Sequence, residues 1–129
     1  MKNKYLSYIE SFKDFPKEGV IFWDFTPLLE SPDIFKSAIE DIKNHFKNKE
    51  ITKIASIEAK GFTLGSALAY ETGKPLILIR KLGLIPGKVL SEKFVKEYGT
   101  GEYQVKQDSV NSKDKVLIVY DIKAGAGAT

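Results

Sequence analysis

The sequence has 129 residues, with 20 Lys or Arg against 17 Asp or Glu, so its formal net charge is only +3. A hydrophobic share of 43% is too high for a disordered chain, and the length suits one folded domain. The absence of cysteine excludes a disulfide framework, a thiolate metal site and a cysteine nucleophile, and the single histidine excludes a site built from several histidines.

The same composition bears on location and partners. No segment approaches the roughly 20 consecutive apolar residues of a membrane-spanning helix, and the first residues lack the apolar core of a secretion signal. The basic residues are interleaved with acidic ones along the chain rather than gathered in a block. We therefore expect a cytoplasmic protein with neither a membrane nor a nucleic acid as its partner.

Residues 4–12 are expected to form a short amphipathic helix. Their apolar side chains recur at helical spacing, at Tyr5, Leu6, Ile9 and Phe12. The helix should end before Pro16, because the residue that precedes a proline is disfavoured in the helical conformation.

A longer helix is expected to begin at Ser31, Pro32 and Asp33. Serine is a favoured N-cap, proline suits the first helical position, and aspartate interacts well with the positive end of the helix dipole. The apolar face of this helix comprises Ile34, Phe35, Ala38, Ile39, Ile42 and Phe46. His45 lies near the edge of that face, which favours a packing or solvent role over a catalytic one.

Three short apolar runs, residues 53–57, 75–79 and 116–119, predict buried strands. A helical pattern at about 62–71 separates the first two runs. Apolar strands without polar alternation, joined by a crossover of this length, indicate parallel strands covered on both faces. The predicted fold class is therefore α/β, with a parallel sheet flanked by helices.

The stretch between the second and third runs has a different character. Glycines and prolines punctuate it, and apolar residues alternate only weakly at 89–94 and 102–105. This pattern predicts an excursion of loops and hairpin-like strands above the sheet.

Candidate ligand-binding residues follow each predicted strand, because open α/β sheets bind ligands beyond the carboxyl ends of their strands. A glycine turn with a lysine follows the first run at 58–61, and the adjacent cations Arg80 and Lys81 follow the second on a predicted loop. Asp121 and a loop of small residues at 124–128 follow the third. Together these segments predict a site for a polyanionic, hydroxyl-bearing ligand such as a phosphorylated sugar.

Five motifs in order carry a resemblance to a known family. They are FPKEGVIFWDFTP at 15–27, EAKGF at 58–62, RKLGLIPG at 80–87, EYGT at 97–100 and VLIVYD at 116–121. From about residue 15 to its end the sequence resembles the adenine phosphoribosyltransferases, type I phosphoribosyltransferases. The resemblance implies a pentosyltransferase of purine salvage, which transfers the phosphoribosyl group from phosphoribosyl pyrophosphate to adenine, giving AMP and pyrophosphate, with Mg²⁺ bound through the diphosphate.

The resemblance also implies roles for individual residues on the base and leaving-group sides. The segment that corresponds to the adenine pocket is Ile21, Phe22 and Trp23. The cations that correspond to the pyrophosphate site are Lys60, Arg80 and Lys81.

Further roles fall on the ribose phosphate side. Glu97 corresponds to a catalytic acidic residue on a mobile flap that assists proton transfer at the purine, a general acid/base task, and Tyr120 with the catalytic Asp121 corresponds to an acidic pair that contacts the ribose hydroxyls. The loop that corresponds to the family's phosphate-binding loop is Ala124, Gly125, Ala126, Gly127 and Ala128.

Several of these positions depart from the family pattern. Lys60 replaces an Arg, Leu84 replaces a Lys and Tyr120 replaces an Asp, while the loop at 124–128 lacks the usual Thr hydroxyls. These departures leave open an alternative function, in which a catalytically impaired phosphoribosyltransferase-like module binds adenine or AMP.

The resemblance finally implies an organisation for the whole chain. We expect residues 1–129 to form a single phosphoribosyltransferase-like domain that is shortened after the phosphate loop, so that its sheet is incomplete at the C-terminus. By the same resemblance we expect a homodimer.

Overall fold

A computed structural model describes residues 2–96 and 99–120. The predicted site residues Glu97 and Asp121 and the loop 124–128 lie outside the described residues. The chain divides into two compact units, one that covers residues 2–44 and one that covers 45–120.

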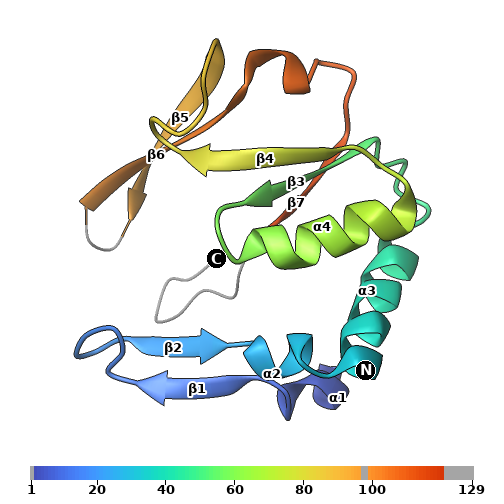
Figure 1. The fold of residues 1–129 in the computed structure, drawn as a ribbon, viewed down its shortest axis with the longest axis vertical. Coiled ribbons are helices and arrows are strands. Elements are labelled where there is room, and N and C mark those ends of the chain that lie inside the picture. Colours follow the sequence, from blue (N-terminus) through green and yellow to red (C-terminus); the bar gives the residue numbers. More distant parts are fainter. Residues whose placement is uncertain (1, 97–98, 121–129) are drawn as a thin grey trace. The chain divides into compact units, whose positions relative to one another are not determined.

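The first unit contains a two-stranded sheet and three helices. The elements in chain order are α1 (Lys2–Leu6), β1 (Glu10–Lys13), β2 (Ile21–Asp24), α2 (Thr26–Leu29) and most of α3 (Pro32–Phe46). β1 and β2 are antiparallel, with Phe12 opposite Phe22 (Figure 1).

The helix expected over residues 4–12 is wrong beyond Leu6, because residues 10–13 form β1. The turn between β1 and β2 explains the difference. The carboxylate of Asp14 accepts a hydrogen bond from the amide of Gly19 (2.9 Å), and the amide of Phe15 donates to the carbonyl of Val20 (3.2 Å). This turn brings β2 alongside residues 10–13, and ladder pairing overrides a short helical pattern.

The longer helix is confirmed as α3. The amide of Phe35 donates to the carbonyl of Ser31 (2.9 Å), and the hydroxyl of Ser31 donates to the carbonyl of Pro27 (3.0 Å). Ile39 is buried on the predicted apolar face, whereas His45 is exposed with its ring edge against Phe46.

The second unit is built on a five-stranded mixed sheet of strand order β5-β6-β4-β3-β7 (Figure 1). Its strands are β3 (Lys53–Ile57), β4 (Leu76–Lys81), β5 (Val89–Lys96), β6 (Gly99–Lys106) and β7 (Val116–Val119), and its helices are α4 (Gly61–Thr72) and the short η1 (Gln107–Ser109). β3 pairs in parallel with β4 and β7, which confirms the predicted parallel core.

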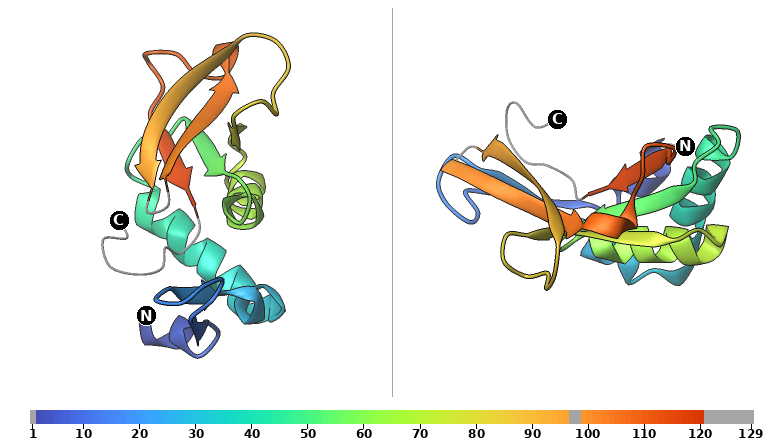
Figure 2. Two further views of the ribbon diagram at one scale, coloured as in Figure 1. Left: turned by 90° about the vertical axis from the view of Figure 1, so that its left-hand side faces the viewer. Right: turned by 90° about the horizontal axis from the view of Figure 1, so that it is seen from above.

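The hairpin formed by β5 and β6 corrects one expectation. It does not rise above the sheet as predicted, because β6 pairs antiparallel with β4 and continues the sheet sideways. Figure 2 shows the two strands side by side as a long twisted pair. Pairing to the free edge of β4 satisfies backbone groups that would otherwise need water.

The core of the second unit lies around β3. Ile54, Ala55 and Ser56 are buried in succession, and successive strand residues point to opposite faces, so both faces of β3 are covered. α4 lies along one of these faces (Figures 1 and 2). Gly65 of α4 makes this close approach feasible, since a Cβ there would lie 1.5 Å from the Ser56 hydroxyl oxygen.

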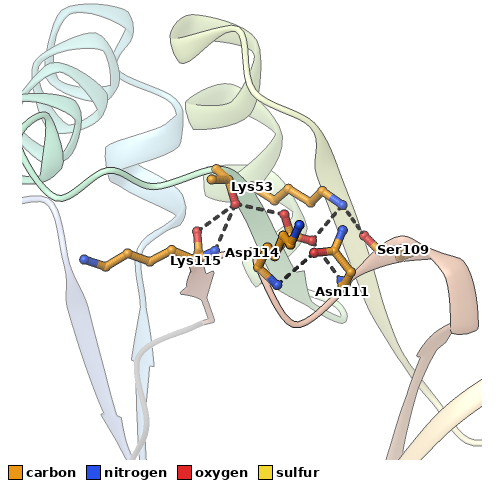
Figure 3. A network of polar contacts seen from close by, with 7 residues as sticks. Lys53, Ser109, Asn111, Asp114 and Lys115 are labelled. Atoms are coloured by element: carbon orange, nitrogen blue, oxygen red, sulfur yellow. Dashed lines mark hydrogen bonds and ion pairs between the residues drawn. The ribbon is translucent and has the colours of Figure 1, made fainter.

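A network of polar contacts ties the start of β3 to the segment before β7 (Figure 3). The Lys53 ammonium lies 2.9 Å from the Asp114 carboxylate and donates to the carbonyl of Ser109 (2.8 Å). Asp114 also accepts from the Thr52 hydroxyl (3.0 Å) and from the Asn111 amide (2.9 Å). The Lys53 hydrogen bond and then the Asn111 amide hold the pKa of Asp114 below its ordinary value of 3.8.

This network predicts a pH dependence of stability. A carboxyl with a lowered folded-state pKa stabilises the fold above its unfolded pKa, and that contribution is lost as the pH falls from about 4 through the folded-state value. Asp114→Asn should therefore be less stable than the wild type at pH 7, and the difference should shrink below about pH 4. Urea unfolding midpoints measured from pH 7 to pH 2.5 test this, and a difference that stays constant over that range would contradict it.

Candidate active site

The carboxyl ends of β3, β4 and β7 meet at one edge of the sheet. Ile57 pairs with Ile79, and Ser56 pairs with Val119, so β3 and β7 end at about the same level and β4 continues two residues further. The structure therefore brings together the turn at 58–61, the two cations at the end of β4 and the residue that follows β7.

The turn after β3 packs directly on the chain after β7. A Cβ at Gly61 would lie 2.6 Å from the carbonyl oxygen of Val119 and 3.0 Å from the Cα of Tyr120, so only glycine fits there. Lys60 is half-buried at the N-cap of α4. The first turn of α4 thus begins at the same edge, where the amides of Phe62 and Thr63 donate to the carbonyls of Ala59 (3.1 Å) and Lys60 (3.2 Å).

Arg80 and Lys81 are the last two residues of β4 and do not lie on a loop as predicted. They pair with Gln104 and Tyr103 of β6. The sequence pattern predicts a strand that ends at residue 79, because the partner β6 comes from a distant part of the chain. Pairing with β6 extends β4 and fixes the backbone of both cations.

Glu58 is a site residue that the motif analysis did not single out. Its Oε1 atom accepts a hydrogen bond from Nε of Arg80 (3.1 Å) and one from the backbone amide of Lys81 (3.3 Å). The Glu58 side chain is 16% exposed and that of Arg80 is 35% exposed, so the carboxylate of this ion pair is more shielded from water than the guanidinium. The available signal was the order of the predicted strands, because Glu58 follows the run 53–57, Arg80 follows the run 75–79, and parallel pairing of Ile57 with Ile79 places the two side by side.

The segment that resembles an adenine pocket lies on β2 in the first unit. Phe22 and Trp23 are half-buried and Ile21 is exposed. The ring of Phe15 contacts that of Phe22 edge-on, with centroids 5.1 Å apart. The rings of Phe15 and Phe22 therefore form an aromatic pair at this strand.

The remaining predicted residues are placed only in part. Tyr120 directly follows β7 and is exposed. Leu84, which stands where the family pattern has a lysine, is exposed on the segment between β4 and β5.

Over residues 2–96 and 99–120, no helix is long and apolar enough to cross a membrane.

Comparisons with known proteins extend these observations, although no family model matches the sequence. The chain is 45% identical over 119 residues to an adenine phosphoribosyltransferase of Idiomarina loihiensis, covering 92% of this chain and 67% of the relative. It is 44% identical over 120 residues to the adenine phosphoribosyltransferase of Thermosipho melanesiensis, covering 93% of this chain and 69% of the relative. The chain thus spans about two thirds of the length of these curated relatives.

Solved structures agree with the sequence comparison. A crystal structure of adenine phosphoribosyltransferase from Thermoanaerobacter pseudethanolicus superposes with a TM-score of 0.88 at 34% identity, covering 94% of this chain and 70% of that one. The Saccharomyces cerevisiae enzyme, crystallised with adenine and an imino-altritol bisphosphate, gives a TM-score of 0.82 at 27% identity, covering 90% of this chain and 68% of that one. Similarity at this level in both sequence and fold agrees with the cationic edge, by which we mean Lys60, Arg80 and Lys81 at the carboxyl ends of the parallel strands. The chain belongs to the adenine phosphoribosyltransferase family.

Proposed function

We propose that this chain catalyses transfer of the phosphoribosyl group from phosphoribosyl pyrophosphate to adenine, giving AMP and pyrophosphate. The observation that carries the proposal is the cationic edge itself. Arg80 is oriented by Glu58 within the sheet, Lys81 follows it in the same strand, and Lys60 lies at the N-terminus of α4. Fixed positive charge is most effective where negative charge develops, which in this reaction is on the departing pyrophosphate.

The reaction breaks the bond between the anomeric carbon and a pyrophosphate oxygen and forms a bond from that carbon to an adenine nitrogen. The electron pair of the broken bond leaves with pyrophosphate, where Lys60, Arg80 and Lys81 stabilise it. The family resemblance assigns adenine to Ile21, Phe22 and Trp23 of β2, where an aromatic ring can pack against the base. The nitrogen that attacks loses its proton to Glu97, the residue that the family resemblance assigns to this step.

Mg²⁺ fits this scheme as an ion carried in by the substrate. Within the described ranges, no three His, Asp or Glu side chains are grouped so that they could hold a metal ion. The cationic edge instead suits a diphosphate that already coordinates the ion through its own oxygens. The bound ion would neutralise part of the diphosphate charge.

The proposal is tested by incubating the purified chain with labelled adenine, phosphoribosyl pyrophosphate and Mg²⁺ and measuring AMP. We expect AMP from the wild type and none above the blank from Asp121→Ala, since that carboxylate is assigned to the ribose hydroxyls. A folded wild type that binds adenine but forms no AMP would contradict the proposal and favour the alternative of an impaired binding module.

The proposed assembly is a cytoplasmic homodimer. Large apolar side chains on the sheet support association, since Leu78 of β4 and Ile118 of β7 are 44% and 51% exposed in the single chain. Sedimentation velocity at micromolar concentration should show a dimer of about twice the chain's mass of 14.5 kDa. A monomer at every concentration tested would contradict this prediction.

A further inference from the structure

Gln104 is a buried polar side chain to which neither the motifs nor the family resemblance assigns a role. It lies in the middle of β6 and is only 8% exposed. Its neighbours in the ladder are Arg80 on β4 and Ser91 on β5, and paired residues of an antiparallel ladder share one face of the sheet. Gln104 is therefore next to Arg80 in a polar row that crosses the sheet at the cationic edge.

Both ends of the Gln104 amide are engaged. Its Oε1 atom accepts a hydrogen bond from the backbone amide of Gly83 (3.1 Å), and its Nε2 atom donates to the hydroxyl of Ser91 (2.8 Å). Gly83 lies two residues after Lys81, at the point where the chain leaves β4. The amide of Leu82 also donates to the carbonyl of Glu102 (3.0 Å), so residues 82 and 83 are both hydrogen-bonded to β6.

These contacts complement those of Glu58 on the other side of β4. Glu58 holds the Arg80 side chain and the Lys81 amide from β3, while Gln104 holds the Gly83 amide from β6. The two cations therefore sit between anchors on both neighbouring strands. Loss of either hydrogen bond would leave a polar group of this buried amide without a protein partner, which costs free energy. The two hydrogen bonds therefore stabilise one conformation of the turn.

We propose that Gln104 is a positioning residue for pyrophosphate recognition: it fixes the Leu82–Gly83 turn and thereby the direction in which Arg80 and Lys81 present their charges. This inference rests on the proposed function of the site. It goes beyond that function because Gln104 acts through the turn rather than by contact with substrate.

The test compares Gln104→Leu with Gln104→Glu and Ser91→Ala in the full chain. Leucine has similar size and no hydrogen-bonding groups. Glutamate keeps an acceptor for the Gly83 amide and accepts from the Ser91 hydroxyl, which can turn its proton toward the carboxylate. Ser91→Ala removes the second bond and leaves the bond to Gly83 in place.

Steady-state kinetics and calorimetric titration of phosphoribosyl pyrophosphate give one readout, and hydrogen exchange of the Gly83 amide gives the other. For Gln104→Leu we expect roughly tenfold weaker phosphoribosyl pyrophosphate binding, an unchanged KM for adenine and faster exchange at Gly83. Ser91→Ala should keep slow exchange and stay within about threefold of the wild type in phosphoribosyl pyrophosphate binding. Gln104→Glu should also keep slow exchange at Gly83 but should bind phosphoribosyl pyrophosphate more weakly, because its added carboxylate repels the ligand. If Gln104→Leu does not fold, Gln104→Ser replaces it, because a short hydroxyl side chain leaves room for water and cannot reach Gly83.

The outcomes separate this inference from the proposed function. If the wild type binds phosphoribosyl pyrophosphate and forms AMP but the leucine or serine variant binds it equally well, the role of Gln104 is overturned and the proposed function stands. An equal rise in the KM values of both substrates would also overturn it, since a merely structural role predicts a general loss. If the wild type binds no phosphoribosyl pyrophosphate, the proposed function fails and the inference fails with it.

Discussion

Gly65→Ala should destabilise the protein by about 3 kcal/mol or more, because the new methyl group overlaps Ser56 and the neighbouring backbone cannot move away without opening the core. The Cβ would lie 1.5 Å from the Ser56 hydroxyl oxygen and 2.8 Å from its Cβ. A loss of this size lowers the thermal midpoint of a domain of this length by roughly ten degrees or more.

The geometry also predicts which second change restores stability. With Ser56→Gly, the nearest Ser56 atom that remains is Cα, which lies at 3.7 Å, an ordinary van der Waals distance. The double variant Ser56→Gly, Gly65→Ala should therefore recover most of the loss, whereas Ser56→Ala, Gly65→Ala should recover little because the 2.8 Å overlap persists. Thermal unfolding followed by circular dichroism measures all of these variants.

Ser56→Ala alone serves as the matched control. The Ser56 hydroxyl is the buried side-chain polar atom that has no hydrogen-bond partner in the described part of the chain. Its removal should be neutral or stabilising by up to about 1 kcal/mol, since an unsatisfied buried hydroxyl is unfavourable. A thermal midpoint for Gly65→Ala equal to that of the wild type would contradict the described packing of α4 on β3.

Arg80→Met should lower kcat/KM for phosphoribosyl pyrophosphate by a factor of roughly 10² to 10³, because it removes a cation that the proposed function places at the leaving group. The loss has a second cause, since Glu58 then keeps its charge without the Arg80 guanidinium that lies 3.1 Å from it. An unpaired carboxylate at the same edge repels pyrophosphate, so it adds to the effect of the missing cation.

A double variant separates the two causes. Glu58→Gln, Arg80→Met removes the repelling charge but keeps an acceptor for the Lys81 amide, so it should be roughly tenfold more active than Arg80→Met alone. Lys106→Met is the matched control for loss of one positive charge, because Lys106 is exposed at the C-terminal end of β6 and belongs to none of the segments assigned to the site, and it should stay close to wild-type activity. Equal activities for Arg80→Met and the double variant would contradict the expected repulsion between the Glu58 carboxylate and pyrophosphate.

Local pattern was sufficient for the parallel core and for α3 and α4. Runs such as 53–57 contain no polar alternation, and this property is typical of a strand that is covered on both faces, as β3 is. The residues that begin α3 and those that form its apolar face likewise lie within one short segment of the sequence. The roles of Lys60, Arg80 and Lys81 followed from resemblance and from the rule that ligands bind at strand ends, and those roles remain predictions.

Pairing between distant segments decided the rest. Residues 10–13 carry a pattern that suits a helix or a strand, and the turn at 14–19 selects the strand by offering β2 as a partner. The same reason explains why β4 extends through Lys81, since its last two residues gain ladder partners that lie more than twenty residues away. Hydrogen bonds such as those of Glu58 and Gln104 depend on which strands become neighbours, and that choice is made by the free energy of the whole sheet rather than by any short segment.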